Sequence, residues 1–279
     1  MSFLPDIFET FISPDCNRCQ FIINTLAKYG VQCSIVPIND SKHILVKFPM
    51  TSYNPMFRIK TIIVHYDRVE NSPGANDNSA AVFQVMMWAI RLSKMNTPHN
   101  VRIFFTDGEE LGSSCGVSEQ GAFGIASKFR SLGILNDDVY VFDCCGRGDL
   151  PVISIAGKGV GNDSFKKKFD SLVNRTEDLL RTVSPEKWLS LPVPYSDNAS
   201  FLACGIPAVA ITILPSEEAT LYLQNLQKSP SAKQDKNVPK TWQLLHTPQD
   251  DLSSLNPEAF KLMDSILDTI AKSKSLANY

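Results

Sequence analysis

The sequence has no long hydrophobic run. A membrane-spanning helix needs about 18–20 consecutive apolar residues, and none of the 279-residue chain offers such a stretch. Residues 1–10 are acidic and contain a proline, whereas a signal peptide needs a basic start and an uninterrupted apolar segment. We therefore expect a cytoplasmic protein without a membrane partner.

The chain also lacks a basic surface pattern. Its net charge is −2, and no block of lysines and arginines is interleaved with aromatic residues, which argues against nucleic-acid binding. The short run Lys166-Lys167-Lys168 is typical of a solvated helix face. The partners that remain are proteins, peptides and small molecules.

Cysteine is present but not in a disulfide pattern. The seven cysteines are scattered and odd in number, which favours a reducing compartment. Cys16 and Cys19 have the spacing of a redox or zinc motif, but no second pair follows and no strand precedes them. They are therefore interpreted as ordinary thiols at a helix start. Cys144 and Cys145 follow Asp143 and are expected to pack beneath it.

What the chain does contain is an alternation of strand and helix patterns. Apolar content of 43% and charged content of 20% are ordinary for a globular protein. Nearly continuous apolar runs predict strands, and 3.6-residue periodicity predicts helices. The predicted strands are 43–49, 61–65, 101–106, 139–143, 152–156 and 208–214, and the predicted helices are 17–29, 79–95, 120–132, 162–175 and 257–273. This alternation predicts a layered α/β/α domain with a mainly parallel sheet.

The domain organisation is predicted to be simple. No internal repeat or clean linker divides the chain, so residues 1–279 are expected to form a single domain. The least regular segment is a polar insertion around residues 216–240, just upstream of His246. Such a segment either forms a lid that shapes the substrate site or merely decorates the surface.

Candidate functional residues lie where strands are predicted to end. The apolar run 101–105 leads into a glycine-hinged acidic turn that contains Glu109 and Glu110. His65 and Asp143 likewise close apolar runs. Open α/β sheets build their sites at the carboxyl ends of their strands. The acidic turn alone is most simply a solvated loop, but several such placements together indicate a site.

These residue types suit a pair of metal ions. Two divalent cations about 3.5–4 Å apart need a bridging carboxylate, and Asp77, just before a predicted helix, is the candidate. His65 with Asp143 could serve one ion, and Glu110 with His246 the other. Imidazole and carboxylate together suit zinc. Three carboxylates would leave one of four positive charges, enough to bind a hydroxide and lower its pKa.

Two acidic residues remain for other roles. Glu109 would lie beside the ions without binding them, so it could take a proton from water and pass it to a leaving amine. Asp67 lies two residues after His65 and would point to the same face, where it could accept the second ring N–H. Each residue singly has an ordinary structural explanation. Yet the chain has only four histidines, and two fall where a metal pair requires them.

The motifs resemble those of the co-catalytic zinc aminopeptidases, metallopeptidase family twenty-eight, which includes the bacterial leucyl aminopeptidases. They run in the family's order over about 200 residues. The matching stretches are His65-Tyr66-Asp67, Gly74-Ala75-Asn76-Asp77-Asn78, Gly108-Glu109-Glu110-Leu111-Gly112, Val141-Phe142-Asp143, Ser196-Asp197-Asn198, Gly205-Ile206-Pro207 and His246-Thr247-Pro248.

The resemblance implies a three-layer α/β/α sandwich with a mixed, mostly parallel central sheet. It implies His65 and Asp143 on one zinc ion, and Glu110 and His246 on a second. Asp77 would bridge the two ions and precede a cis peptide bond.

The implied reaction is removal of the N-terminal residue from a peptide or aminoacyl substrate. A metal-bound hydroxide would attack the carbonyl carbon, with Glu109 as general base. The sequence leaves open the preferred N-terminal residue and the oligomeric state.

The sequence also departs from the family pattern. Asn198 stands where the family usually has histidine, and the register of Tyr195 does not clearly match the oxyanion tyrosine, so the oxyanion donor stays open. Glutaminyl cyclases, which bind one zinc, resemble the chain at residues 107–110 and are the main alternative. They typically place tryptophan directly before the last histidine, where this chain has Leu245, with Trp242 three residues earlier. A non-catalytic protein that retains the fold is the other alternative.

Overall fold

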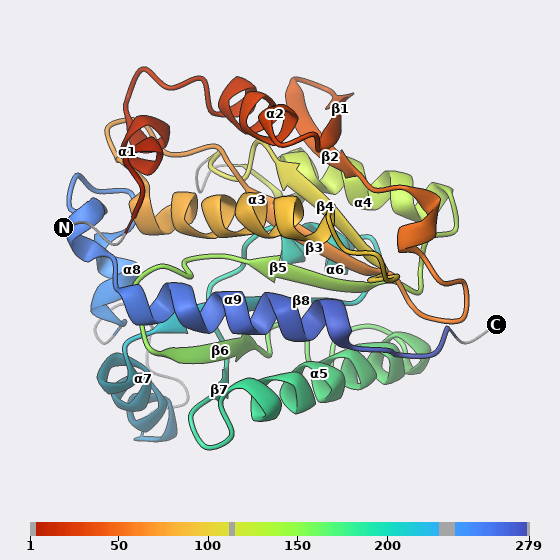
Figure 1. Cartoon of the computed structure of the whole chain (residues 1–279). Helices are drawn as coiled ribbons and strands as arrows, with labels where there is room; N and C mark the ends of the chain where they lie inside the picture. Colours follow the sequence, from red (N-terminus) through yellow and green to blue (C-terminus); the bar gives the residue numbers. More distant parts are fainter. Residues whose placement is uncertain (1–3, 112–114, 229–237, 278–279) are drawn as a thin grey trace.

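The computed structural model describes residues 4–111, 115–228 and 238–277. Its centre is an eight-stranded sheet in the order β1-β2-β4-β3-β5-β8-β6-β7 (Figure 1). The strands are β1 (Gln32–Ile38), β2 (Ser41–Lys47), β3 (Lys60–His65), β4 (Val101–Thr106), β5 (Asp138–Phe142), β6 (Leu150–Ser154), β7 (Leu189–Leu191) and β8 (Ala208–Leu214). The four central strands β4, β3, β5 and β8 are parallel, whereas β1 and β2 form an antiparallel hairpin and β6 runs antiparallel to β8. This confirms the prediction of a mixed, mostly parallel sheet.

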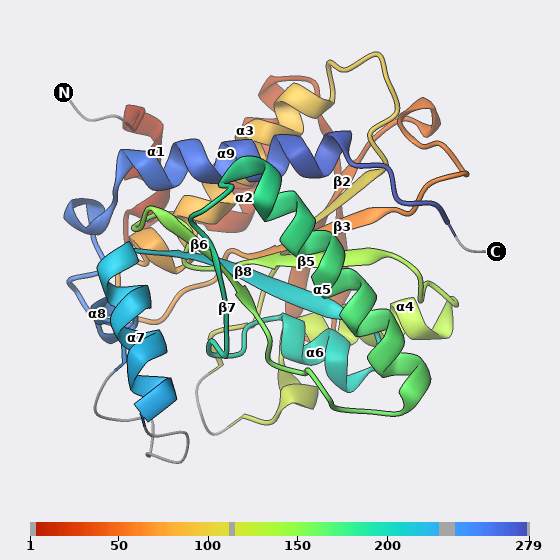
Figure 2. The same ribbon diagram turned by 90° about the horizontal axis from the view of Figure 1, so that it is seen from below.

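Helices cover both faces of this sheet, which completes the three layers (Figures 1 and 2). The first face carries α2 (Arg18–Lys28), α3 (Ala80–Leu92), α5 (Asp163–Val183) and α9 (Pro257–Lys272), with α1 (Asp6–Ile12) packed on α3. The second face carries α4 (Gly121–Ser131), α6 (Asn198–Ala203) and α7 (Ser216–Lys228). The short helix α8 (Lys240–Leu244) precedes His246.

Burial on both faces explains the continuous apolar runs of the central strands. Along β8, Val209, Ile211 and Ile213 join the core under the first helical layer, whereas Ala208 and Ala210 join the core under α4 and α6. Each large side chain buried in this way stabilises the fold by about 1.5–3 kcal/mol. Alternate residues of β8 therefore pack against opposite helical layers. Because every residue of the strand is buried, a charged side chain at any of its positions would be buried too.

The structure differs from the sequence prediction in elements that are exposed on one side. Strand β1 was not predicted, because it lies at the sheet edge and its side chains are exposed or only partly buried. Helix α7 occupies the segment at 216–228 that was expected to be irregular, and residues 229–237 of that predicted insertion lie outside the described residues. Helix α5 continues eight residues beyond its predicted end at 175, to Val183.

The predicted start of α9 is confirmed. The side chain of Asn256 accepts a hydrogen bond from the N–H of Glu258 and so caps α9 at its predicted start. All seven cysteines are free thiols. In the part of the chain that the structure describes, no helix combines the length and the hydropathy that a membrane crossing demands.

Candidate metal centre

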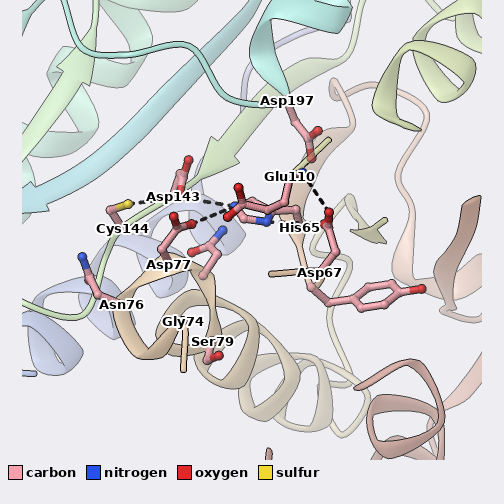
Figure 3. Close-up of polar contacts among 12 residues, drawn as sticks. His65, Asp67, Gly74, Asn76, Asp77, Ser79, Glu110, Asp143, Cys144 and Asp197 are labelled. Atoms are coloured by element: carbon pink, nitrogen blue, oxygen red, sulfur yellow. Dashed lines mark hydrogen bonds and ion pairs between the residues drawn. The ribbon is translucent and has the colours of Figure 1, made fainter. Parts of the chain in front are cut away.

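The carboxyl ends of the central strands bring the predicted site residues together (Figure 3). His65 is the last residue of β3, and Asp143 follows β5, its neighbour in the sheet. The turn after β4 carries Glu109 and Glu110. Because parallel strands end at the same edge, residues 78 positions apart in the chain become neighbours.

Asp77 lies between the two histidines. Its Oδ1 is 3.3 Å from Nε2 of His65, and its Oδ2 is 3.2 Å from Nε2 of His246. On the outer sides, Oδ1 of Asp143 is 3.5 Å from Nε2 of His65, and Oε2 of Glu110 is 3.0 Å from Nε2 of His246. The five predicted ligands therefore form two groups that share one carboxylate.

These separations fit ligands arranged around metal ions. With metal–ligand bonds of about 2.0–2.1 Å, two donors on a tetrahedral zinc ion lie about 3.3 Å apart. The His65 side chain is 1% exposed, and its ring nitrogens lie 3.3–3.5 Å from carboxylate oxygens of Asp67, Asp77 and Asp143 without forming a well-aligned hydrogen bond. A cation bound beside Nε2 would satisfy this ring nitrogen and the facing carboxylate oxygens together.

The charge at the site also favours cations. Burial, together with the neighbouring carboxylates, raises the pKa of Glu109 and of Glu110 to about 9. Burial likewise raises the pKa of Asp77, but the facing imidazoles of His246 and His65 outweigh it and hold that pKa well below its ordinary value. So many carboxylates in one buried place need positive charge to stay ionised. The residues present fit divalent cations such as zinc.

Asp67 connects the two groups of ligands. Its Oδ1 lies 3.5 Å from Nδ1 of His65, and its Oδ2 accepts a hydrogen bond of 2.8 Å from the N–H of Glu110. One carboxylate thus orients a ring on β3 and the backbone of the turn after β4. Asp67 lies two residues after His65, and its carboxylate faces the ring of that histidine.

The backbone around Asp77 is fixed by residues from distant parts of the chain. The Asp77–Asn78 peptide is cis, as the resemblance implied, and Nδ2 of Asn78 donates to the carbonyl of Phe142 at 2.8 Å. The carboxylate of Asp250 accepts hydrogen bonds from the N–H groups of Asn76 at 2.8 Å and Asp77 at 3.0 Å. Sequence reasoning missed Asp250, because an aspartate in a polar loop carries no periodic or motif signal.

A buried arginine stabilises the loop between His65 and Asp77 through hydrogen bonds. Arg18, at the start of α2, donates to the carbonyl of Tyr66 at 3.1 Å, to that of Pro73 at 2.9 Å and to Oγ of Ser79 at 2.8 Å. Burial lowers its pKa to about 10, so it remains charged at neutral pH. Arg18 was not predicted either, because it lies between Cys16 and Cys19, which were interpreted as ordinary thiols.

The same loop also donates hydrogen bonds to the segment that precedes α2. Arg68 donates to the carbonyls of Ile12 at 2.7 Å and Pro14 at 2.9 Å. Reciprocal contacts therefore join the segment before α2 to the loop that carries Asp67 and Asp77.

The loop before α6 closes another side of the site. Asp197 is buried, and its Oδ2 accepts a hydrogen bond of 2.5 Å from Oγ1 of Thr106; burial raises its pKa to about 6. Asn198, which departs from the family pattern, accepts a hydrogen bond from the N–H of Ser196 at 3.0 Å and so holds this loop. Tyr195 is 58% exposed and lies at the rim.

Cys144 and Cys145 are both buried against Asp143, as expected. The Sγ of Cys144 donates to Oδ1 of Asp143 at 3.3 Å, and the Sγ of Cys145 donates to its carbonyl at 3.4 Å. Burial raises the pKa of both thiols well above the ordinary value, so neither is a ready nucleophile.

A cavity opens directly beside the predicted ligands. Asp77, Glu109, Asp143 and His246 form its polar wall. The remaining wall is mostly apolar and is built by Val193, Pro194, Tyr195, Ala210, Ile211, Trp242 and Leu245, with Cys144, Ser196 and Thr212. This arrangement suits a ligand with a polar group at the acidic cluster and an apolar side chain beside it.

Comparisons with known proteins point to one family. The model of Peptidase family M28 matches residues 58–271. No curated protein matches the sequence. Among solved structures, the chain is similar to a Zn-dependent exopeptidase from Parabacteroides distasonis, with 14% identity, a TM-score of 0.63 and coverage of 98% of this chain and 99% of the other.

Two further solved structures share the fold. A glutaminyl cyclase from Porphyromonas gingivalis has 14% identity, a TM-score of 0.63 and coverage of 95% of this chain and 94% of the other. The LapA aminopeptidase of Legionella pneumophila has 15% identity, a TM-score of 0.62 and coverage of 97% of this chain and 71% of the other. At such identities the likeness concerns the fold alone.

Proposed function

The chain belongs to peptidase family M28, and from this premise we propose that it is a zinc-dependent aminopeptidase that releases N-terminal residues from peptides. The observation that carries the proposal is the position of Asp77, with one carboxylate oxygen facing each imidazole at 3.3 and 3.2 Å. A carboxylate shared in this way is what a pair of cations requires.

Each ligand has a proposed place. His65 and Asp143 would hold one zinc ion, Glu110 and His246 the other, and Asp77 both. Zinc bound there would polarise a carbonyl group and acidify a water molecule. Asp67 would keep the ring of His65 in the tautomer whose Nε2 is free to bind a metal.

Glu109 is the proposed proton carrier. It is largely buried beside the ligands, and metal charge nearby would lower its raised pKa towards neutrality, where a general base works best. Its carboxylate would take a proton from the attacking water and deliver it to the departing amine. The apolar part of the neighbouring cavity would receive the side chain of the N-terminal residue.

The test combines metal analysis with a panel of aminoacyl amides and the substitution Glu109→Gln. We expect two zinc ions per chain, release of the amino acid, and a loss of about 10²–10⁴-fold in kcat for the variant without loss of metal. Glu119→Gln is a matched control on an exposed glutamate. A fully active Glu109→Gln protein would refute the role of this residue.

The same experiment separates the main alternative, a glutaminyl cyclase. Because the chain is similar in structure to a glutaminyl cyclase over nearly its whole length, cyclisation of N-terminal glutamine is the second candidate reaction. One tightly bound zinc per chain, together with pyroglutamate formation from peptides with N-terminal glutamine, would favour the cyclase. A protein with neither metal nor turnover would be a binding protein that retains the fold.

A further inference from the structure

A second cavity begins at the rim of the candidate site and follows α6 along the second face of the sheet. Three of the predicted ligands, Asp77, Asp143 and His246, line the first cavity, and Tyr195 lines both cavities. The floor of the second is one face of α6, formed by Ala199, Leu202 and Ala203, because residues three and four apart share a helix face. A groove therefore leads away from the acidic cluster.

Hydrogen bonds at the two ends of α6 show which end of the groove lies next to the candidate site. At the start of α6, Oγ of Ser200 donates to Oε1 of Gln120 at 3.3 Å, and Asp197 approaches Thr106 at the end of β4. At the end of α6, Nη1 of Arg130 lies 3.5 Å from the carbonyl of Cys204. The start of α6 is thus the end next to the site, and Arg130 marks the far end.

The walls of the groove are apolar, although they face solvent. Val160 is 61% exposed, Val117 39% and Leu135 36%, and Phe165 also lines the groove. These side chains come from different segments, and Figure 2 shows α4, α5 and α6 arranged around this region. An apolar surface gathered from several segments around a hollow is typical of a binding site.

The far end of the groove is positively charged. Arg130 and Lys168 both line it, and its lining contains no aspartate or glutamate among the described residues. Within the part of the chain that the structure describes, neither side chain forms an ion pair; Nζ of Lys168 lies 3.4 Å from Oδ1 of Asn136. Two cations without acidic partners leave a favourable position for an anion.

We propose that this groove binds the part of a short peptide that lies downstream of the cleaved bond, with its C-terminal carboxylate at Arg130 and Lys168. This inference rests on the proposed aminopeptidase function. From Ala199 to Gly205, which lies two residues beyond the end of α6, the lining extends about 9 Å at a helical rise of about 1.5 Å per residue. An extended chain covers that distance with about three residues. The preferred substrate is therefore a peptide of about four residues, rather than a long chain or a lone aminoacyl amide.

The experiment compares three substrates that share the same N-terminal residue: leucine amide, the peptide Leu-Ala-Ala-Ala and the C-terminal amide of that peptide. The wild-type protein is expected to prefer the free carboxylate over the amide by about tenfold in kcat/KM, the value of a charge-assisted contact. In the double variant Arg130→Gln, Lys168→Gln this preference should fall to about one. Ala203→Trp, which fills the groove at an exposed position, should lower the rate on the peptide relative to leucine amide.

Matched controls stand on the same two helices. The double variant Lys128→Gln, Lys166→Gln removes two exposed or partly exposed charges outside the groove lining and should keep the full preference. If the wild-type protein cleaves leucine amide but treats both peptides alike, the groove inference is wrong and the aminopeptidase proposal stands. If the protein releases no amino acid from any member of the aminoacyl-amide panel, the proposed function fails and the inference fails with it.

Discussion

The two halves of the candidate metal centre are built differently. His65 is 1% exposed and ends a central strand, where Asp67 orients its ring and Arg18 braces the following loop. His246 is 54% exposed, follows the short helix α8 and has a φ of 61°. A donor already fixed by the sheet loses little conformational freedom when an ion binds, whereas a loop donor must be ordered. We therefore expect the His65 half to bind zinc more tightly than the His246 half.

Removing one histidine at a time is the strongest test of this difference. His65→Ala should leave almost no tightly bound zinc, whereas His246→Ala should retain about one ion per chain. Both should lose about 10³-fold or more in kcat/KM, because each half is needed for the reaction. Metal analysis after dialysis against a weak chelator measures the difference. His99→Gln provides the control histidine substitution, and equal zinc contents in the two alanine variants would contradict the comparison.

Asp250 allows a finer test, because it supports the residue that both halves share. Asp250→Asn should lower metal affinity or kcat by about 10–100-fold, since one side of the amide cannot accept the N–H groups of Asn76 and Asp77. Asp251→Asn is the matched neighbour, which caps a different turn. Competition with a fluorescent zinc chelator reads the affinity. An Asp250→Asn protein with the same affinity as the Asp251→Asn protein would show that Asp77 needs no such support.

The smallest expected effect contrasts two buried histidines. Nearby carboxylates raise the pKa of His65, even though burial opposes them, whereas burial and Lys60 lower the pKa of His99 to about 4. His99 is therefore neutral in the folded protein but titrates near 6.5 when unfolded. Its contribution to stability is complete above pH 6.5 and decreases as pH falls towards 4, by about 1–3 kcal/mol.

Urea unfolding at pH 7.5 and pH 5 measures this contribution. The wild-type protein should lose more stability between the two values than His99→Gln does, and comparing the two proteins cancels the titration of the metal ligands. The ring of His99 packs on Phe48 with centroids 4.7 Å apart, so Phe48→Leu serves as a packing control. An identical pH dependence in wild type and His99→Gln would rule out the effect.

The sequence revealed the strand-borne half of the site more fully than the rest. Strands buried on both faces produce apolar runs that stop at His65 and Asp143, so the positions of these residues could be predicted from pattern alone. His246 follows no strand, so no apolar run marks its position; the need of a metal pair for a second imidazole pointed to it, and the family resemblance implied the same role.

Long-range contacts were out of reach for the same reason. Asp250 meets Asn76 across 174 positions of the chain, and Arg18 meets Ser79 across 61. Neither contact leaves a periodic trace in the sequence. The edge strand β1 and helix α7 were missed, because an element that is exposed on one side carries no continuous apolar run. The predictable part of the molecule is thus the part in which burial dictates residue type.

The hydrogen bonds of Arg18 and Arg68 join the N-terminal segment to the loop that carries Asp77, and this has a practical consequence for protein engineering. The stretch matched by the family model begins at residue 58, so a shortened protein that starts at that boundary would lack Arg18 and leave Arg68 without its carbonyl acceptors. The shortened protein would keep every proposed zinc ligand, but the loop that carries Asp77 would lack the hydrogen bonds that hold it in place. Chimeras and minimal versions of this protein should therefore carry the first two helices along with the ligands.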